Sequence, residues 1–186
     1  ATGFDDVHFH VLIPPEAAAE ALELLLDLVL EPRLDGDDFA MERQVVLEEL
    51  AQSEDQPEEV AFQELLRRAC PSHAYGLPIL GRREALETHR PEAMAAFHQR
   101  HYRADRCCLA VAGPLQHLDL GQRLAQSALA ALPAATTADG LKPLDLQSGD
   151  ATLQLPRLEA ARLLMAWRLP GAADQDAVVG GDLLTT

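Results

Sequence analysis

The stretch that decides the fold class is VHFHVLIPPEAAAEALELLLDLVLEP, residues 7–32. Its first part, 7–14, alternates between two faces and is rich in β-forming residues, which predicts a strand. Pro15 suits a first helical turn, and the leucines that follow recur at helical spacing as far as Pro32. A strand followed at once by an amphipathic helix predicts a sheet with helices laid on it.

The rest of the chain repeats this alternation. Further helices are expected over 34–53, 57–70, 83–88, 91–101 and 116–131, and from 174 onward, and further strands over 106–113, 151–156 and 161–169. The predicted fold class is therefore α+β, a two-layer sandwich in which helices cover one face of a mostly antiparallel sheet. A doubly wound sheet is the alternative, but no glycine-rich turn from strand to helix supports it. The loop 133–150 is long enough to link two domains.

Composition narrows the function classes. The 186 residues are 48% hydrophobic and carry a formal net charge of −15, which argues against sequence-independent nucleic-acid binding. The three cysteines, two of them adjacent, are expected as buried reduced thiols. No apolar run approaches the roughly 20 residues of a membrane span. Because the sequence begins with Ala1 in strand-like residues and ends inside a helix, we expect both ends to lie within a longer polypeptide, and a cytoplasmic location by default.

Histidine pairs give weak metal signals. Two pairs share a face of a predicted element: His8 with His10 on a strand, and His98 with His101 on a helix. The helical pair has no third ligand nearby, and for the strand pair two ligands alone are weak evidence, because a zinc site needs at least three protein ligands. A structural or solvated role is therefore the simpler interpretation of both pairs.

The stretch ERQVVLEELAQSEDQPEE, residues 42–59, gives a stronger signal. Glu42 and Glu49 are two helical turns apart and share one part-apolar face, whereas Glu48 turns away toward Gln44. Two carboxylates on such a face repel each other and lose hydration unless a cation lies there. A divalent metal bound by one and supported by the other would remove that cost. Taken alone, the residues fit a solvated helix edge more simply.

Several stretches in one order resemble the insulinase/pitrilysin-type zinc metallopeptidases, close to mitochondrial processing peptidase and its bacterial relatives. These are ERQVVLEEL, the acidic SEDQPEE, HAYGLPILGRREAL and FHQRHYRADRCCLAVAGPL. The resemblance runs from Ala1 to Gly113 and continues more loosely to the end. It implies that residues 1–145 are the C-terminal part of a first half-domain of this family, and that 146–186 begin a second, homologous one.

The same resemblance implies a zinc site. In the family, an inverted motif His-x-x-Glu-His supplies two ligands and the general base, and a glutamate on a separate helix is the third ligand. That glutamate falls on Glu49, and the carboxylate that supports the site falls on Glu42. No His-x-x-Glu-His occurs in the 186 residues, and the family spacing would put it roughly 25 residues before Ala1. We therefore expect no catalytic residue within the chain, and an isolated chain that is inactive and holds zinc poorly.

The resemblance implies that the whole protein is a zinc endopeptidase acting on peptides or small unfolded chains. The alternative is a non-catalytic binding or assembly subunit of the same fold. Because a subunit relieved of catalysis has no need of the carboxylate pair, retention of Glu42 and Glu49 favours the enzyme. Expected partners are a peptide substrate and the remaining lobes or partner subunit, with neither nucleic acid nor membrane. Exposed strand edges should make the isolated chain self-associate.

Overall fold

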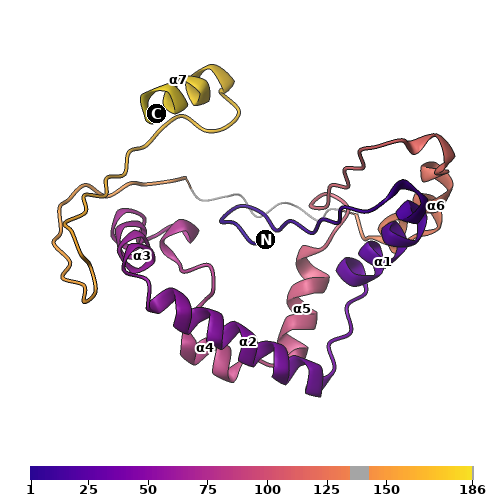
Figure 1. Cartoon of the computed structure of the whole chain (residues 1–186), viewed down its shortest axis with the longest axis horizontal. Coiled ribbons are helices and arrows are strands. Elements are labelled where there is room, and N and C mark those ends of the chain that lie inside the picture. The colour runs from indigo at the N-terminus through magenta and orange to yellow at the C-terminus, as the bar shows by residue number, and fades with distance from the viewer. Residues whose placement is uncertain (135–142, 186) are drawn as a thin grey trace. The chain divides into compact units, whose positions relative to one another are not determined.

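The computed structural model describes residues 1–134 and 143–185, and within them the chain is helical. The α-helices are α1 (Ala18–Leu30), α2 (Gly36–Glu54), α3 (Pro57–Ala69), α4 (Arg83–Thr88), α5 (Pro91–His101), α6 (Leu120–Gln126) and α7 (Gln175–Thr185) (Figure 1). Short 3-10 turns are η1 (Pro15–Ala17), η2 (Ala74–Gly76), η3 (Leu115–His117) and η4 (Ala128–Ala131). The predicted helices are confirmed, except that the one expected over 116–131 is broken into η3, α6 and η4.

The predicted α+β sandwich is wrong, because residues 1–134 and 143–185 contain no strand, only an isolated antiparallel bridge between Thr2 and Val7. The four segments expected as strands, 7–14, 106–113, 151–156 and 161–169, have no regular structure. A strand is stable only when a neighbouring strand pairs with its backbone N–H and C=O groups. No such neighbour lies beside these segments in the described ranges, so their β-forming composition alone does not make a sheet.

The chain divides into two compact units. The first comprises Ala1–Glu48 with Gly81–Leu141, and the second comprises Glu49–Leu80 with Lys142–Thr186. The division falls within α2, so this helix contributes to both. The middle of the predicted linker, 135–142, lies outside the described residues, and the predicted half-domain boundary between residues 145 and 146 stays a prediction.

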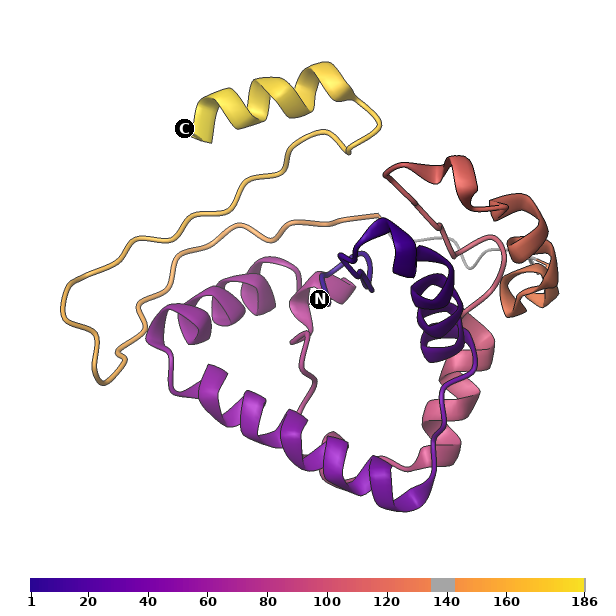
Figure 2. The same cartoon turned by 45° about the vertical axis from the view of Figure 1, so that its right-hand side comes forward.

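The first unit is built around α1. Leu22 and Leu26 lie one turn apart on its inner face and are each 7% exposed. Helix α1 packs against η4 (Figure 2), and Arg123 of α6 makes an ion pair with Glu23 of α1. The amphipathic pattern read from residues 15–32 is therefore confirmed as a helix. Where a sheet was predicted, its apolar face packs in part against η4 and in part lines a cavity.

The second unit is held together where α3 ends. Helix α3 packs against η2, and Cys70, the residue after α3, is 2% exposed. The backbone N–H of Gln147 donates to the carbonyl oxygen of Ala69 at 2.8 Å. Gly76 lies so close to this junction that a Cβ on it would be 2.3 Å from the carbonyl oxygen of Cys70. A residue without a side chain is therefore required at position 76.

The long extended segment of the second unit, 151–169, makes two exposed ion pairs with the residues around the start of α3. Arg157 lies 3.3 Å from Asp55, and Arg162 lies 3.7 Å from Glu58. Its apolar side chains remain exposed, for example 81% for Leu163 and 66% for Trp167. These exposed side chains are consistent with self-association of the isolated chain, which stays a prediction. No helix in the described part of the chain is both long and apolar enough to span a membrane.

A local ion-pair cluster on α3 makes the stability of the second unit depend on pH. Glu64 accepts hydrogen bonds from Arg67 at 2.7 Å and Arg68 at 2.5 Å. The hydrogen bond from Arg67 above all, together with Arg68, lowers the pKa of Glu64 from 4.5 to about 2, although desolvation opposes the shift. The ionised form of Glu64 therefore stabilises the folded state above pH 4.5, and this contribution is lost as the pH falls through about 2.

We expect Glu64→Gln to lower the free energy of unfolding by about 1 kcal/mol at pH 7, since both arginines are more than half exposed and water screens the pairs. Urea unfolding followed by circular dichroism checks this value. The difference from the unsubstituted chain should shrink below pH 4.5 and vanish near pH 2. Glu159→Gln, at an exposed position of the same unit, is the control. A difference for Glu64→Gln that stayed constant down to pH 2 would contradict the ion-pair origin.

Candidate functional site

Helix α2 carries both carboxylates that the sequence singles out. It begins where Asp35 Oδ1 accepts a hydrogen bond from the backbone N–H of Asp38 at 3.2 Å. Acidic residues in its first turn, Asp37 and Asp38, face the positive end of the helix dipole. Leu50 is the one buried residue of α2. The helix is therefore largely exposed. The hydrogen bond at its N-terminus, and not the burial of its side chains, explains why it begins at this point.

Glu42 and Glu49 lie two turns apart on α2, which is helical throughout between them. Both side chains are exposed, and neither makes a hydrogen bond or ion pair with another of the described residues. Seven residues of helix rise by about 10 Å, so an ion bound by one carboxylate is reached by the other only through an intervening group. This geometry suits one ligand and one supporting group better than two direct ligands.

The valines between Glu42 and Glu49 are less buried than the sequence suggests. Val45 is 57% exposed and Val46 is half-buried, so the face is only partly apolar. The loss of hydration expected for Glu42 and Glu49 is therefore not observed in this chain. Glu48 is exposed and accepts a hydrogen bond from Gln44 at 3.3 Å, as expected for a residue that turns away from the pair.

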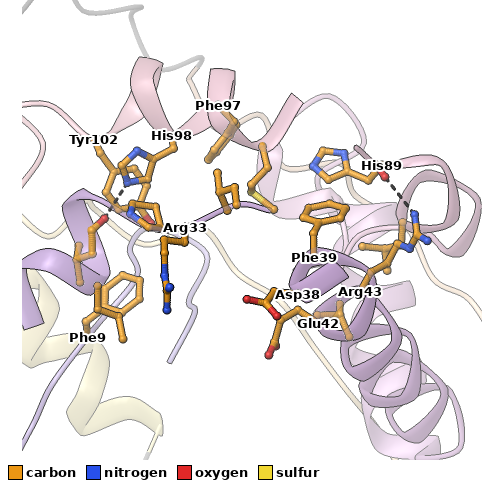
Figure 3. A pocket seen from close by; sticks show the side chains of 17 residues that line it. Phe9, Arg33, Asp38, Phe39, Glu42, Arg43, His89, Phe97, His98 and Tyr102 are labelled. Carbon is orange, nitrogen blue, oxygen red and sulfur yellow. Dashed lines mark hydrogen bonds between the residues drawn. The ribbon is translucent and has the colours of Figure 1, made fainter. Parts of the chain in front are cut away.

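A cavity of about 370 Å³ opens beside Glu42 within the first unit. Its walls are mainly apolar and include Phe39 of α2 and Phe97 of α5. Figure 3 shows Asp38 and Glu42 next to each other on α2, with Arg33 on the other side of the opening. The cavity can accommodate apolar groups next to two carboxylates and the guanidinium groups of Arg33 and Arg43.

Arg43 does not neutralise its neighbour Glu42. Its Nη1 donates to the carbonyl oxygen of His89 at 3.3 Å (Figure 3) and to that of Glu87 at 3.4 Å. The ring of His89 also lies against Phe39, with centroids 6.0 Å apart. Arg43 therefore fixes the first half of α2 to the end of α4 and leaves the carboxylate of Glu42 available.

Of the histidines considered as metal ligands, His8 and His98 each have another contact. His98 Nε2 lies 2.8 Å from the carbonyl oxygen of Val29, and its ring stacks on Tyr102 with centroids 4.1 Å apart. His8 Nε2 lies 2.8 Å from a carboxylate oxygen of Asp6. Within residues 1–134 and 143–185, no group of three or more His, Cys, Asp or Glu side chains could hold a metal ion.

The cysteines are all free, but they are not all buried as predicted. Cys70 is buried, Cys107 is half-buried and Cys108 is exposed. Burial raises the pKa of the Cys107 thiol, which keeps it protonated at neutral pH. The prediction of buried thiols is therefore wrong for Cys108, whose predicted strand does not form.

Sequence reasoning did not place the other charged residues of the cavity, Arg33, Asp38 and Arg43, beside Glu42. Asp38 precedes Glu42 by four residues, so helical spacing could have placed it on the same face. Arg33 follows the end of α1, and nothing in the sequence indicates that it turns toward α2. Its position depends on how the loop between the two helices folds.

Two family models match the chain. Residues 1–83 match insulinase (peptidase family M16), and residues 90–185, just over half of the chain, match the peptidase M16 inactive domain. The chain belongs to the insulinase (M16) peptidase family. The resemblance in the motifs around Glu42 and Glu49 is thereby confirmed at the level of the family, although the matches do not test the roles of these two residues.

Relatives of this M16 chain include zinc proteases by name. An uncharacterized zinc protease of Mycobacterium leprae is 32% identical over 161 residues, which are 81% of this chain and 35% of that protein. The beta subunit of mitochondrial-processing peptidase of Blastocladiella emersonii is 30% identical over 132 residues, 71% of this chain and 28% of that protein. The zinc protease YmxG of Bacillus subtilis, also uncharacterized, is 29% identical over 105 residues, 56% of this chain and 26% of that protein. The M16 chain thus spans about a third or less of these relatives.

Proposed function

We propose that this chain is part of a zinc-dependent endopeptidase that hydrolyses peptides or small unfolded chains. The observation that carries the proposal is Glu49, which lies exposed and unpaired among the described residues on α2 of an M16 family chain. It ends the run Arg-x-Val-Val-Leu-x-Glu, and Glu42 lies two turns before it on the same helix. The names of the zinc proteases among the relatives support the same assignment.

The donor set fits part of a zinc site. A glutamate oxygen is an accepted zinc ligand, and Glu49 would give up no ion pair with a described residue in order to bind. Glu42 would hydrogen-bond to another ligand and so fix its orientation. Since a catalytic zinc needs three protein ligands, the other two would come from outside the described residues. When bound, zinc acts as a Lewis acid and lowers the pKa of a water molecule.

A second candidate is a binding or assembly subunit of the same family. The model that matches residues 90–185 is that of an inactive domain, which favours a scaffolding role for that part of the chain. The two candidates differ in one measurable property. The enzyme requires stoichiometric zinc, whereas the binding subunit requires none.

Zinc removal from the full-length protein tests the proposal. We expect about one zinc per active site by elemental analysis, and loss of hydrolysis of an unfolded peptide after treatment with 1,10-phenanthroline. Because the ion is essential to the chemistry, activity should return when zinc is added back. Dialysis without chelator is the control. Zinc-free protein with full activity would overturn the proposed enzyme, and protein that contains no zinc and shows no hydrolysis would favour the binding subunit.

A further inference from the structure

A basic cluster lies within an otherwise acidic chain. Arg100, Arg103 and Arg106 fall within seven residues at the end of α5, next to His101 and a single acid, Asp105. The whole chain has a formal net charge of −15, so this concentration of cations reverses the local charge. Cations held close together repel one another, and an anion bound among them would remove that cost.

The ring of His101 lies between two guanidinium groups. Arg100 Nε donates to His101 Nε2 at 3.1 Å, and Arg106 Nη1 lies 3.0 Å from His101 Nδ1. A neutral imidazole accepts at one nitrogen and donates at the other. In one of the two contacts, therefore, an N–H of the ring faces an N–H of an arginine, so that two donors meet without an acceptor. An anion that accepts from both donors would resolve this conflict.

Arg103 adds a further donor to the basic cluster. Its Nη2 is buried and has no hydrogen-bond partner in the described part of the chain. Its Nε lies 3.6 Å from Asp105 Oδ1, a distance too long for a good hydrogen bond. The one carboxylate within the cluster thus lies beside Arg103 and does not satisfy all of its donors.

The basic cluster opens on a large apolar cavity. His101 and Arg106 line a cavity of about 730 Å³ within the first unit, together with the extended segments 5–13 and 107–113 and the inner face of α1. Most of the lining is aliphatic, as at Leu25, Val29, Leu109 and Val111. Two acidic residues line it: Asp6 is paired with His8, and Asp5 also has an interaction partner. A volume of this size lies within the range of about 300–1,000 Å³ typical of small-molecule sites.

We propose that this cavity binds an alkyl carboxylate, with its head group at Arg106 and His101 and its hydrocarbon chain along the aliphatic wall. A carboxylate matches the planar fork of an arginine and can accept from the imidazole N–H as well. A singly charged head group is also repelled less than a phosphate dianion by the negative charge of the whole chain. Burial of the alkyl chain supplies the main affinity, and the basic cluster supplies the selectivity for an anion.

Calorimetric titration of the full-length, metal-free protein tests this site independently of hydrolysis. Decanoate is expected to bind at least tenfold more tightly than decanol or decylammonium, each used below its critical micelle concentration, and acetate to bind more weakly than decanoate. Equal affinities for decanoate and decylammonium would overturn the role of the basic cluster. A C-terminally amidated apolar peptide that bound as tightly as decanoate would show that the cavity takes an uncharged extended chain, and would also overturn the proposal.

Substitution at the head-group position completes the test. Arg106→Gln should weaken decanoate binding at least tenfold and leave decanol binding unchanged, because only the charged contact is removed. Arg168→Gln, at an exposed position of the second unit, is the matched control and should change neither. Thermal unfolding of each variant verifies that the fold is kept, and Arg106→Lys should retain part of the preference for the anion. Unchanged decanoate binding in Arg106→Gln would place the anion elsewhere. Since no step depends on zinc, this proposal and the peptidase can fail separately.

Discussion

Glu49→Gln in the full-length protein is expected to remove bound zinc and peptide hydrolysis together. An amide oxygen is a neutral and weaker donor than a carboxylate, so a site with three protein ligands loses both a ligand and a negative charge. The change adds no bulk, and the side chain of Glu49 makes no hydrogen bond or ion pair with the described residues. Folding should therefore be unaffected. Elemental analysis of the purified variant and the initial rate of peptide hydrolysis are the two measurements.

The neighbouring glutamates give the matched comparison. Glu42→Gln should reduce zinc affinity by about 10–100-fold, as is typical for a group that orients a ligand without binding the metal. Glu48→Gln should change neither zinc content nor rate, because Glu48 is exposed and bonded to Gln44. Full zinc content and activity in Glu49→Gln would refute its assignment as a ligand. Equal losses in Glu48→Gln and Glu49→Gln would point to the charge of α2 as a whole.

Gly76→Ala is expected to destabilise the second unit by about 3 kcal/mol. The added methyl group would lie 2.3 Å from the carbonyl oxygen of Cys70. Because that atom belongs to the backbone at the end of α3, no rotation of a side chain relieves the clash, and the turn η2 must move away from α3. The unfolding midpoint in urea, followed by circular dichroism, measures the loss.

Gly36→Ala is the control for the glycine substitution. No atom lies within 4 Å of a Cβ built on Gly36, the first residue of α2. Alanine there should leave stability unchanged or raise it slightly, since it restricts the unfolded chain. A loss in Gly36→Ala as large as that in Gly76→Ala would show that the contact with the carbonyl oxygen of Cys70 does not determine the effect.

The sequence predicts the helices well because each helix carries its own local signal. Pro57 and Pro91 lie in the first turns of α3 and α5, where the missing N–H of proline costs nothing. The predicted strands failed for the opposite reason. Segment 161–169 has the composition of a strand, but a strand depends on hydrogen bonds to a distant partner that no local pattern specifies.

The candidate site likewise has features that the sequence predicts and others that it does not. The spacing of Glu42 and Glu49 along a helix could be read from sequence, and the family resemblance gave them roles. The cavity beside Glu42 could not be predicted, because Arg33 reaches it from a loop and Phe97 from a helix more than fifty residues away. The basic cluster was visible in the sequence, yet the two arginines on either side of His101 became apparent only from the distances.

The charge of α2 has a kinetic consequence. The helix contains six acidic residues and one basic residue, Arg43, which is occupied by the carbonyl oxygens at 87 and 89. The later acids, including Glu49 and Glu54, add to the negative end of the helix dipole. A cation approaching from solution would thus be drawn toward this helix before any ligand geometry is complete. Added salt would slow its arrival, because screening acts over about 10 Å at 0.1 M ionic strength, whereas departure from a formed site would change less.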